Sequence, residues 1–129
     1  MYRLRRVRGH LAQPGHQDQL ENRDGCDPLF AGVLPQQHVV PLPVDDAAEA
    51  LFDAFLSQFG HEVAAMLVEP RVQGAGGMLF HDDTVLARLR KLADRHGLLL
   101  IFDEIFTGFG RTGDLFACQG AGVVPDIVT

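Results

Sequence analysis

Residues 63–104 read VAAMLVEPRVQGAGGMLFHDDTVLARLRKLADRHGLLLIFDE, and this stretch decides the fold. It opens with an apolar run of strand length, 63–68, and closes with another, 98–102. A Gly-rich loop at 73–77 and a helical segment lie between them. The apolar positions of that segment share one helical face: Val85, Leu86, Leu89, Leu92 and Ala93. Strand, loop, helix and strand in this order predict a right-handed βαβ unit, and therefore an α/β fold with a partial parallel sheet.

A second amphipathic helix is predicted upstream of this unit. Asp45 and Asp46 can cap its start, and Gly60 ends it. Its apolar face comprises Ala48, Leu51, Phe52, Phe55, Leu56 and Phe59.

The two ends of the chain carry weaker signals. Residues 114–121 predict a short helix, and 125–129 look like a third strand just beginning. Residues 1–44 are rich in Gln, Gly, Pro and Arg and predict mainly loop. We therefore expect an irregular N-terminal segment, 1–44, followed by a partial α/β large domain, 45–129. The pattern stops inside the expected sheet, which predicts a piece of a larger domain.

Composition narrows the functional classes. The 129 residues carry a net charge of −6, with 11 basic and 17 acidic residues. Four arginines fall in the first ten residues, so positions 11–129 hold 7 bases against 17 acids. This balance disfavours a nucleic-acid-binding body, and the Arg-rich start is either a disordered end or a transit peptide. Two distant cysteines, no metal-ligand spacing among the histidines and no hydrophobic leader favour a cytoplasmic protein without a structural metal.

Carboxylates follow both predicted strands. Ligands of open α/β sheets bind at the carboxyl ends of the strands, where Glu69 and the pair Asp103-Glu104 stand. A carboxylate beside apolar neighbours needs a positive partner. For Asp103 this could be a metal ion, Arg111 or the protonated ring nitrogen of a cofactor, and the scarcity of further carboxylates disfavours the metal. A purely structural aspartate that caps a turn or pairs with Arg111 is the alternative.

The glycines at 108, 110 and 113 match the letters of a G-x-G-x-x-G pattern. They follow an acidic pair and do not clearly open a long helix, so we do not interpret them as a dinucleotide site. A tight turn that places Arg111 over a pocket fits the glycines better.

Several motifs together resemble one family. They are Val68-Glu69-Pro70, residues 72–78, 99–105 and 107–113, and Pro125-Asp126-Ile127. In order and spacing these resemble class III aminotransferases, the pyridoxal 5'-phosphate enzymes of fold type I. Within this class the chain resembles the branch of biotin synthesis at residues 73–78 and 115–118. It also has Ala75 at a position where many ω-aminotransferases carry Glu. That branch transfers an amino group from S-adenosylmethionine to 8-amino-7-oxononanoate to give 7,8-diaminononanoate.

The resemblance implies roles for matched residues. Asp103 would keep the pyridinium nitrogen of pyridoxal phosphate protonated, and Ile105 would pack on one face of its ring. Arg111 would lie at the substrate side, and Glu69 would support the cofactor-binding residues from behind. No metal is implied. The large domain, 45–129, would bind the cofactor, and the complete enzyme would be a homodimer.

The chain also departs from the family pattern. The resemblance is close over 60–129, holds in pieces over 26–59 and hardly exists before that. Gly15-His16-Gln17-Asp18 stands where the family has Tyr-His-Gly-Asp, so the stacking Tyr is missing. The family lysine that attaches the cofactor lies beyond Thr129, and Lys91 is expected on the water-facing side of its helix. We therefore expect a fragment that lacks parts at both ends, contains no catalytic residue and is inactive alone. Another class III ω-aminotransferase, or a noncatalytic interaction module, is the alternative.

Overall fold

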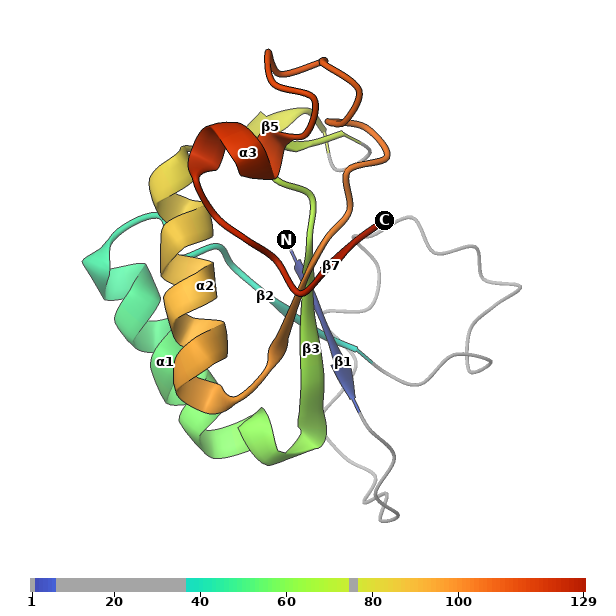
Figure 1. Ribbon diagram of the computed structural model, residues 1–129. Coiled ribbons are helices and arrows are strands. Elements are labelled where there is room, and N and C mark those ends of the chain that lie inside the picture. Colours follow the sequence, from blue (N-terminus) through green and yellow to red (C-terminus); the bar gives the residue numbers. More distant parts are fainter. Residues whose placement is uncertain (1, 7–36, 75–76) are drawn as a thin grey trace.

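The computed structural model describes residues 2–6, 37–74 and 77–129. Its main sheet has five strands in the order β2-β1-β3-β6-β7 (Figure 1). Three strands run parallel, from the central strand to one edge of the sheet: β3 (Val63–Val68), β6 (Leu99–Phe102) and β7 (Ile127–Val128). The parallel βαβ unit predicted from 63–104 is thus confirmed, as is a third strand within the stretch 125–129.

Two antiparallel strands extend the sheet on the other side. β1 (Tyr2–Arg6) pairs with β3, and β2 (His38–Val40) pairs with β1. Both fall in the segment expected to be mainly loop. Such short runs have little periodicity, and their pairing depends on partners distant in sequence. Residues 15–18, where the family motif lacks its Tyr, and the first part of the partly matching segment 26–59, up to residue 36, lie outside the described residues.

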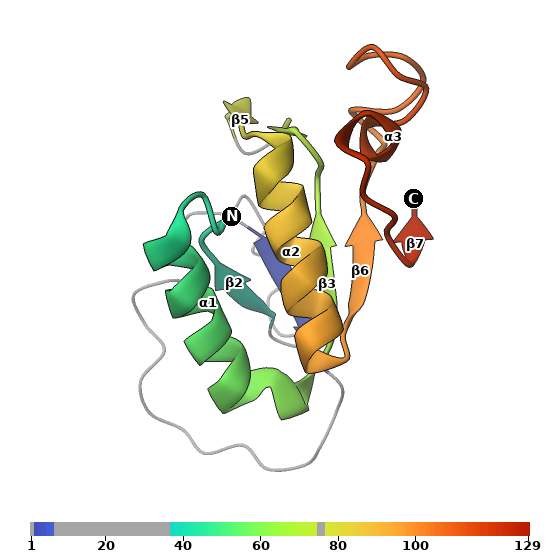
Figure 2. The ribbon, with the colours of Figure 1, turned by 60° about the vertical axis from the view of Figure 1, so that its left-hand side comes forward.

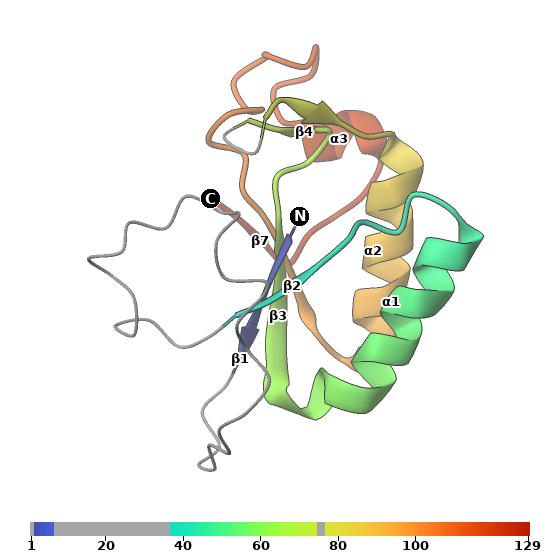
Figure 3. The same cartoon turned by 180° about the vertical axis from the view of Figure 1, so that it is seen from behind.

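Two helices cover the same side of the sheet (Figure 1, Figure 2). They are α1 (Asp46–Phe59) and α2 (Asp83–His96), and the view from behind shows the same arrangement (Figure 3). Asp45 caps α1 by accepting a hydrogen bond from the amide of Ala48 at 2.8 Å. A 3₁₀ turn, η2 (Gly60–Glu62), joins α1 to β3. Gly97 ends α2 in the left-handed conformation, which favours glycine.

The core lies between the two helices and the sheet. All five predicted apolar positions of α2 are buried against it, together with Met66, Val68, Leu100 and Phe102 of the strands. The predicted face of α1 is only partly right, because Phe52 and Leu56 are buried whereas Leu51 is 74% exposed. Leu51 and Leu56 stand roughly 140° apart around a helix, so a helix turned to bury one leaves the other outside.

The remaining elements lie at the carboxyl ends of the parallel strands. β4 (Val72–Gln73) and β5 (Leu79–Phe80) form a small antiparallel hairpin that the Gly-rich pattern did not predict. The helix α3 (Ala117–Ala121) confirms the short helix expected within 114–121. None of the helices in the described part of the chain is long and apolar enough to cross a bilayer.

Candidate functional site

The carboxyl ends of β3 and β6 lie side by side. Val68 and Phe102 are partners in the parallel register, and the amide of Asp103 donates to the carbonyl of Val68 at 2.8 Å. The acidic residues Glu69, Asp103 and Glu104 are therefore brought to one edge of the sheet, as the sequence predicts.

Asp103 is half-buried and caps the turn that it begins. One oxygen of its carboxylate accepts a hydrogen bond from the amide of Ile105 at 3.2 Å. Among the described residues it forms no ion pair, so the pairing with Arg111 considered from the sequence is not seen. Ile105 itself is 81% exposed beside it. Asp103 thus retains a carboxylate at the strand end whose charge no described cation neutralises.

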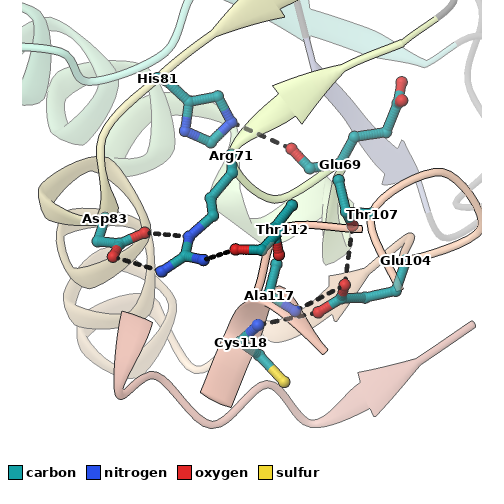
Figure 4. Close-up of polar contacts among 9 residues, drawn as sticks. All are labelled: Glu69, Arg71, His81, Asp83, Glu104, Thr107, Thr112, Ala117 and Cys118. Atoms are coloured by element: carbon teal, nitrogen blue, oxygen red, sulfur yellow. Dashed lines mark hydrogen bonds and ion pairs between the residues drawn. The ribbon is translucent and has the colours of Figure 1, made fainter. Parts of the chain in front are cut away.

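Glu104 has a different environment. It is 1% exposed, and its carboxylate accepts three hydrogen bonds (Figure 4). The donors are the hydroxyl of Thr107 at 2.8 Å and the amides of Ala117 and Cys118 at 2.9 Å each. The sequence placed Glu104 at the strand end as part of an acidic pair, too small a set for a metal site, and assigned it no role of its own. The signal that indicates its burial is the spacing of Leu100, Phe102 and Glu104. Residues two apart along an extended chain point to the same face, and here that face is buried.

Glu69 supports the hairpin that follows β3. Its carboxylate accepts a hydrogen bond from the amide of Gly74 at 2.8 Å, and its carbonyl lies 3.1 Å from the ring of His81. The side chain therefore holds Gly74, near the start of the Gly-rich stretch, close to the strand end. A Cβ at Gly74 would lie 3.1 Å from the ring of Phe106, so Gly74 also packs closely on the segment after β6.

Arg71 joins three elements and was not predicted. Its guanidinium forms a bidentate pair with Asp83 at the start of α2, at 2.7 and 2.8 Å, and donates to the carbonyl of Thr112 at 3.3 Å (Figure 4). The hydrogen bonds from Arg71 lower the pKa of Asp83, and Asp83 in turn raises the pKa of Arg71. Its backbone adopts φ 63°, which is unusual for a residue with a side chain.

A cavity of about 840 Å³ opens between the hairpin, the start of α2 and the loop after β6. Its walls include Met78, Phe80, Val85 and Phe106, and Arg111 lies at the same cavity. The guanidinium of Arg111 lies 4.9 Å from the centre of the Phe106 ring. This agrees with the predicted turn that places Arg111 over a pocket. Asp103, Ile105 and Glu69 are not among the described residues that line it.

The one lysine of the chain lies away from this edge. Lys91 is exposed on α2, and its nearest acidic partner is Glu49 of α1 at 3.8 Å. Among residues 37–74 and 77–129 no group of three His, Cys, Asp or Glu side chains could hold a metal ion.

Comparison with known proteins settles the family. Residues 19–129 match the family model described as aminotransferase class III. The chain belongs to the class III aminotransferases.

Curated relatives of this class III chain include two enzymes named adenosylmethionine-8-amino-7-oxononanoate aminotransferase. The one from Mycobacterium leprae is 48% identical over 122 residues, which cover 88% of this chain and 28% of that protein. The one from Corynebacterium glutamicum is 40% identical over 124 residues, covering 88% of this chain and 29% of that protein. The chain thus spans less than a third of the length of either relative.

Solved structures agree on the fold. An (S)-enantioselective omega-transaminase from Thermomicrobium roseum superimposes with a TM-score of 0.59 and 42% sequence identity, covering 64% of this chain and 18% of that chain. The structural neighbours are fold type I transaminases. Both the family and the α/β fold class predicted from the sequence are confirmed.

Proposed function

We propose that this class III chain supplies part of the cofactor and substrate site of a pyridoxal 5'-phosphate-dependent aminotransferase. We further propose that its substrates are S-adenosylmethionine and 8-amino-7-oxononanoate. The observation that carries this is the carboxylate of Asp103 at the end of β6, half-buried and without a cation among the described residues. The names of the two curated relatives support the choice of substrates.

The residues at the strand ends fit a pyridinium ring. The carboxylate of Asp103 accepts one amide hydrogen bond, so it has lone pairs left to accept a hydrogen bond from the N–H of a protonated ring. Its negative charge favours the protonated form of that ring. Pyridoxal phosphate supplies an electron sink when it is bound. Asp103 would hold the proton on the ring nitrogen, and the exposed Ile105 would contact a face of the ring. Glu69 would keep the Gly-rich loop in place behind them.

Arg111 would act at the substrate side. Within residues 37–74 and 77–129 it is the one Arg or Lys whose side chain makes no ion pair, and it lies at a cavity lined by both apolar and charged residues. A guanidinium in such a place can receive a carboxylate with charge-assisted hydrogen bonds. A homodimer and a cytoplasmic location belong to the same proposal.

A chimera tests this function. Residues 37–129 would replace the matching segment of the Mycobacterium leprae relative, and the corresponding segment of the Corynebacterium glutamicum relative would serve as the control. We expect both chimeras to transfer the amino group from S-adenosylmethionine to 8-amino-7-oxononanoate. Activity in the control and none with this segment would refute the proposal.

A second candidate is another class III ω-aminotransferase. The 42% identity to the Thermomicrobium roseum enzyme favours it. The same chimera assayed with a simple primary amine and pyruvate distinguishes the two, because a preference for these substrates would favour the second candidate.

The 129-residue chain alone is expected to be inactive. Its one lysine, Lys91, is exposed on α2, where its side chain lies near Glu49 of α1 rather than at the strand ends. Incubation with pyridoxal phosphate, borohydride reduction and mass spectrometry should show no saturable adduct on Lys91. A saturable adduct that disappears in Lys91→Ala would contradict this expectation.

A further inference from the structure

The twelve residues 105–116, here called the strand-end loop, are held at both ends by one carboxylate. Glu104 comes directly before the loop and accepts the hydroxyl hydrogen of Thr107 near its start. The same carboxylate accepts the amides of Ala117 and Cys118 directly after its end. Figure 4 shows these donors converging on Glu104. The loop is therefore closed at its base by a single side chain.

The carboxylate of Glu104 is buried without a directly paired cation in the segments 37–74 and 77–129. There no Arg or Lys forms an ion pair with Glu104, although the charge of Arg71 acts on it at longer range. Burial of a charged group at 1% exposure is costly unless hydrogen bonds compensate, and three donors do so here. All three donors come from the strand-end loop or directly after it. The compensation thus depends on the loop keeping its position.

The position of Arg111 depends on how Glu104 closes the two ends of the strand-end loop. The carbonyl of Glu104 accepts the amide of Gly108 at 2.7 Å, and the carbonyl of Gly108 lies 3.5 Å from the amide of Arg111. A Cβ at Gly108 would lie 2.8 Å from the oxygen of Glu104, so the turn sits directly on the strand end. On the far side of Arg111, Arg71 holds the carbonyl of Thr112.

We propose that Glu104 is a positioning residue for Arg111, acting by closing the base of the strand-end loop so that the guanidinium faces the cavity. This rests on the proposed function, in which Arg111 receives an anionic substrate. Glu104 itself touches neither substrate nor cofactor. Its neighbour Asp103 carries the cofactor contact, so the two consecutive acids have separate tasks.

Thr107 offers the cleanest test because its variants can be matched. Thr107→Val removes the hydroxyl and keeps the shape, whereas Thr107→Ser keeps the hydroxyl. In the 129-residue chain, amide hydrogen exchange at Gly108, Ala117 and Cys118 should rise about tenfold in T107V, since a buried carboxylate loses one donor, and should stay near the parent rate in T107S. The amides of β6 serve as the internal reference and should keep their protection.

Two results of that experiment would overturn the proposal. Equal exchange in T107V and T107S would show that the hydroxyl does not hold the loop. A parallel rise in β6 would show general destabilisation and no local positioning. Glu104→Gln provides a second variant, because an amide has one acceptor oxygen where the carboxylate has two, and loss of protection should again be confined to 105–118.

The kinetic consequence is measured in the chimera with the Mycobacterium leprae segments. T107V should raise KM for the carboxylate-bearing substrate about tenfold with kcat within about twofold, and T107S should restore KM. A fall in kcat with unchanged KM would refute positioning of Arg111. If the parent chimera transfers no amino group, the proposed function fails. The exchange experiment still decides whether Glu104 holds the loop.

Discussion

Gly108→Ala is expected to destabilise the chain, although a Gly→Ala change at ordinary backbone angles usually stabilises. The added methyl would lie 2.8 Å from the carbonyl oxygen of Glu104 and 3.3 Å from the ring of Phe116. That oxygen belongs to backbone that already accepts the amide of Gly108, so it cannot move freely. Overpacking of a filled site costs about 1–3 kcal/mol. The lower conformational entropy of the unfolded alanine variant offsets about 0.4–1 kcal/mol of this steric cost.

Gly60→Ala is the matched control for this variant. Gly60 has φ −58° and ψ −27°, and the nearest atom to an added methyl is in the side chain of His96 at 4.0 Å. It should gain the entropic term alone and stabilise by about 0.4–1 kcal/mol. Urea unfolding followed by circular dichroism measures both variants, and their difference isolates the steric cost at Gly108. If Gly108→Ala proves as stable as Gly60→Ala, the close packing of the strand-end loop on β6 is wrong.

Three further outcomes are expected. Arg71→Met should cost about 1 kcal/mol at pH 7, discounted for partial exposure of the pair with Asp83. Because Arg71 lowers the pKa of Asp83 in the fold, this contribution is present above the ordinary carboxyl pKa of about 3.9 and is lost as the pH falls through the lower folded value. Urea midpoints of parent and variant should therefore differ at pH 7 and converge near pH 2, and a constant gap would contradict the bridge. Burial, with the nearby charge of Glu104, raises the pKa of the Cys118 thiol, so in a Cys26→Ser background it should react with a disulfide reagent at pH 8 roughly tenfold more slowly than free cysteine; equal rates would show an accessible thiol. Asp103→Asn should abolish amino transfer in the chimera and change the free energy of unfolding by less than about 0.5 kcal/mol, because an amide oxygen can still accept from Ile105; retained turnover would remove its assigned role.

The central unit could be predicted from the sequence because its signals are local and repeated. The buried stripe of α2 spans several turns, and the apolar runs 63–68 and 98–102 end at an acidic residue or pair. The strands β1 and β2 could not be predicted in this way. Each has at most five residues, and β1 has three arginines among its five, so their pairing depends on the neighbouring strands rather than on local preference.

The sequence predicted where the acidic residues and the turn of Arg111 lie, and it predicted fewer of their contacts. Position after a parallel strand was sufficient to single out Asp103, and the glycines around Arg111 indicated a turn at a pocket. The role of Arg71 could not be predicted, because its partners Asp83 and Thr112 lie 12 and 41 residues away in sequence. No spacing rule connects residues so far apart. The hairpin β4–β5 was missed for a related reason, since its strands have two residues each.

The two acids after β6 show how alternation along a strand separates roles that composition cannot distinguish. Side chains of successive residues point to opposite faces, so Glu104 continues the inward series of Leu100 and Phe102. There three donors satisfy its carboxylate, which leaves little capacity for a ligand. Asp103 receives one amide and remains half-buried, so its charge is available to an incoming cationic group. If strand pairing shifted by one residue, the two environments would exchange. The register of β6 against β3 therefore determines which of the two acids keeps its carboxylate open to a ligand, the role that we propose for Asp103.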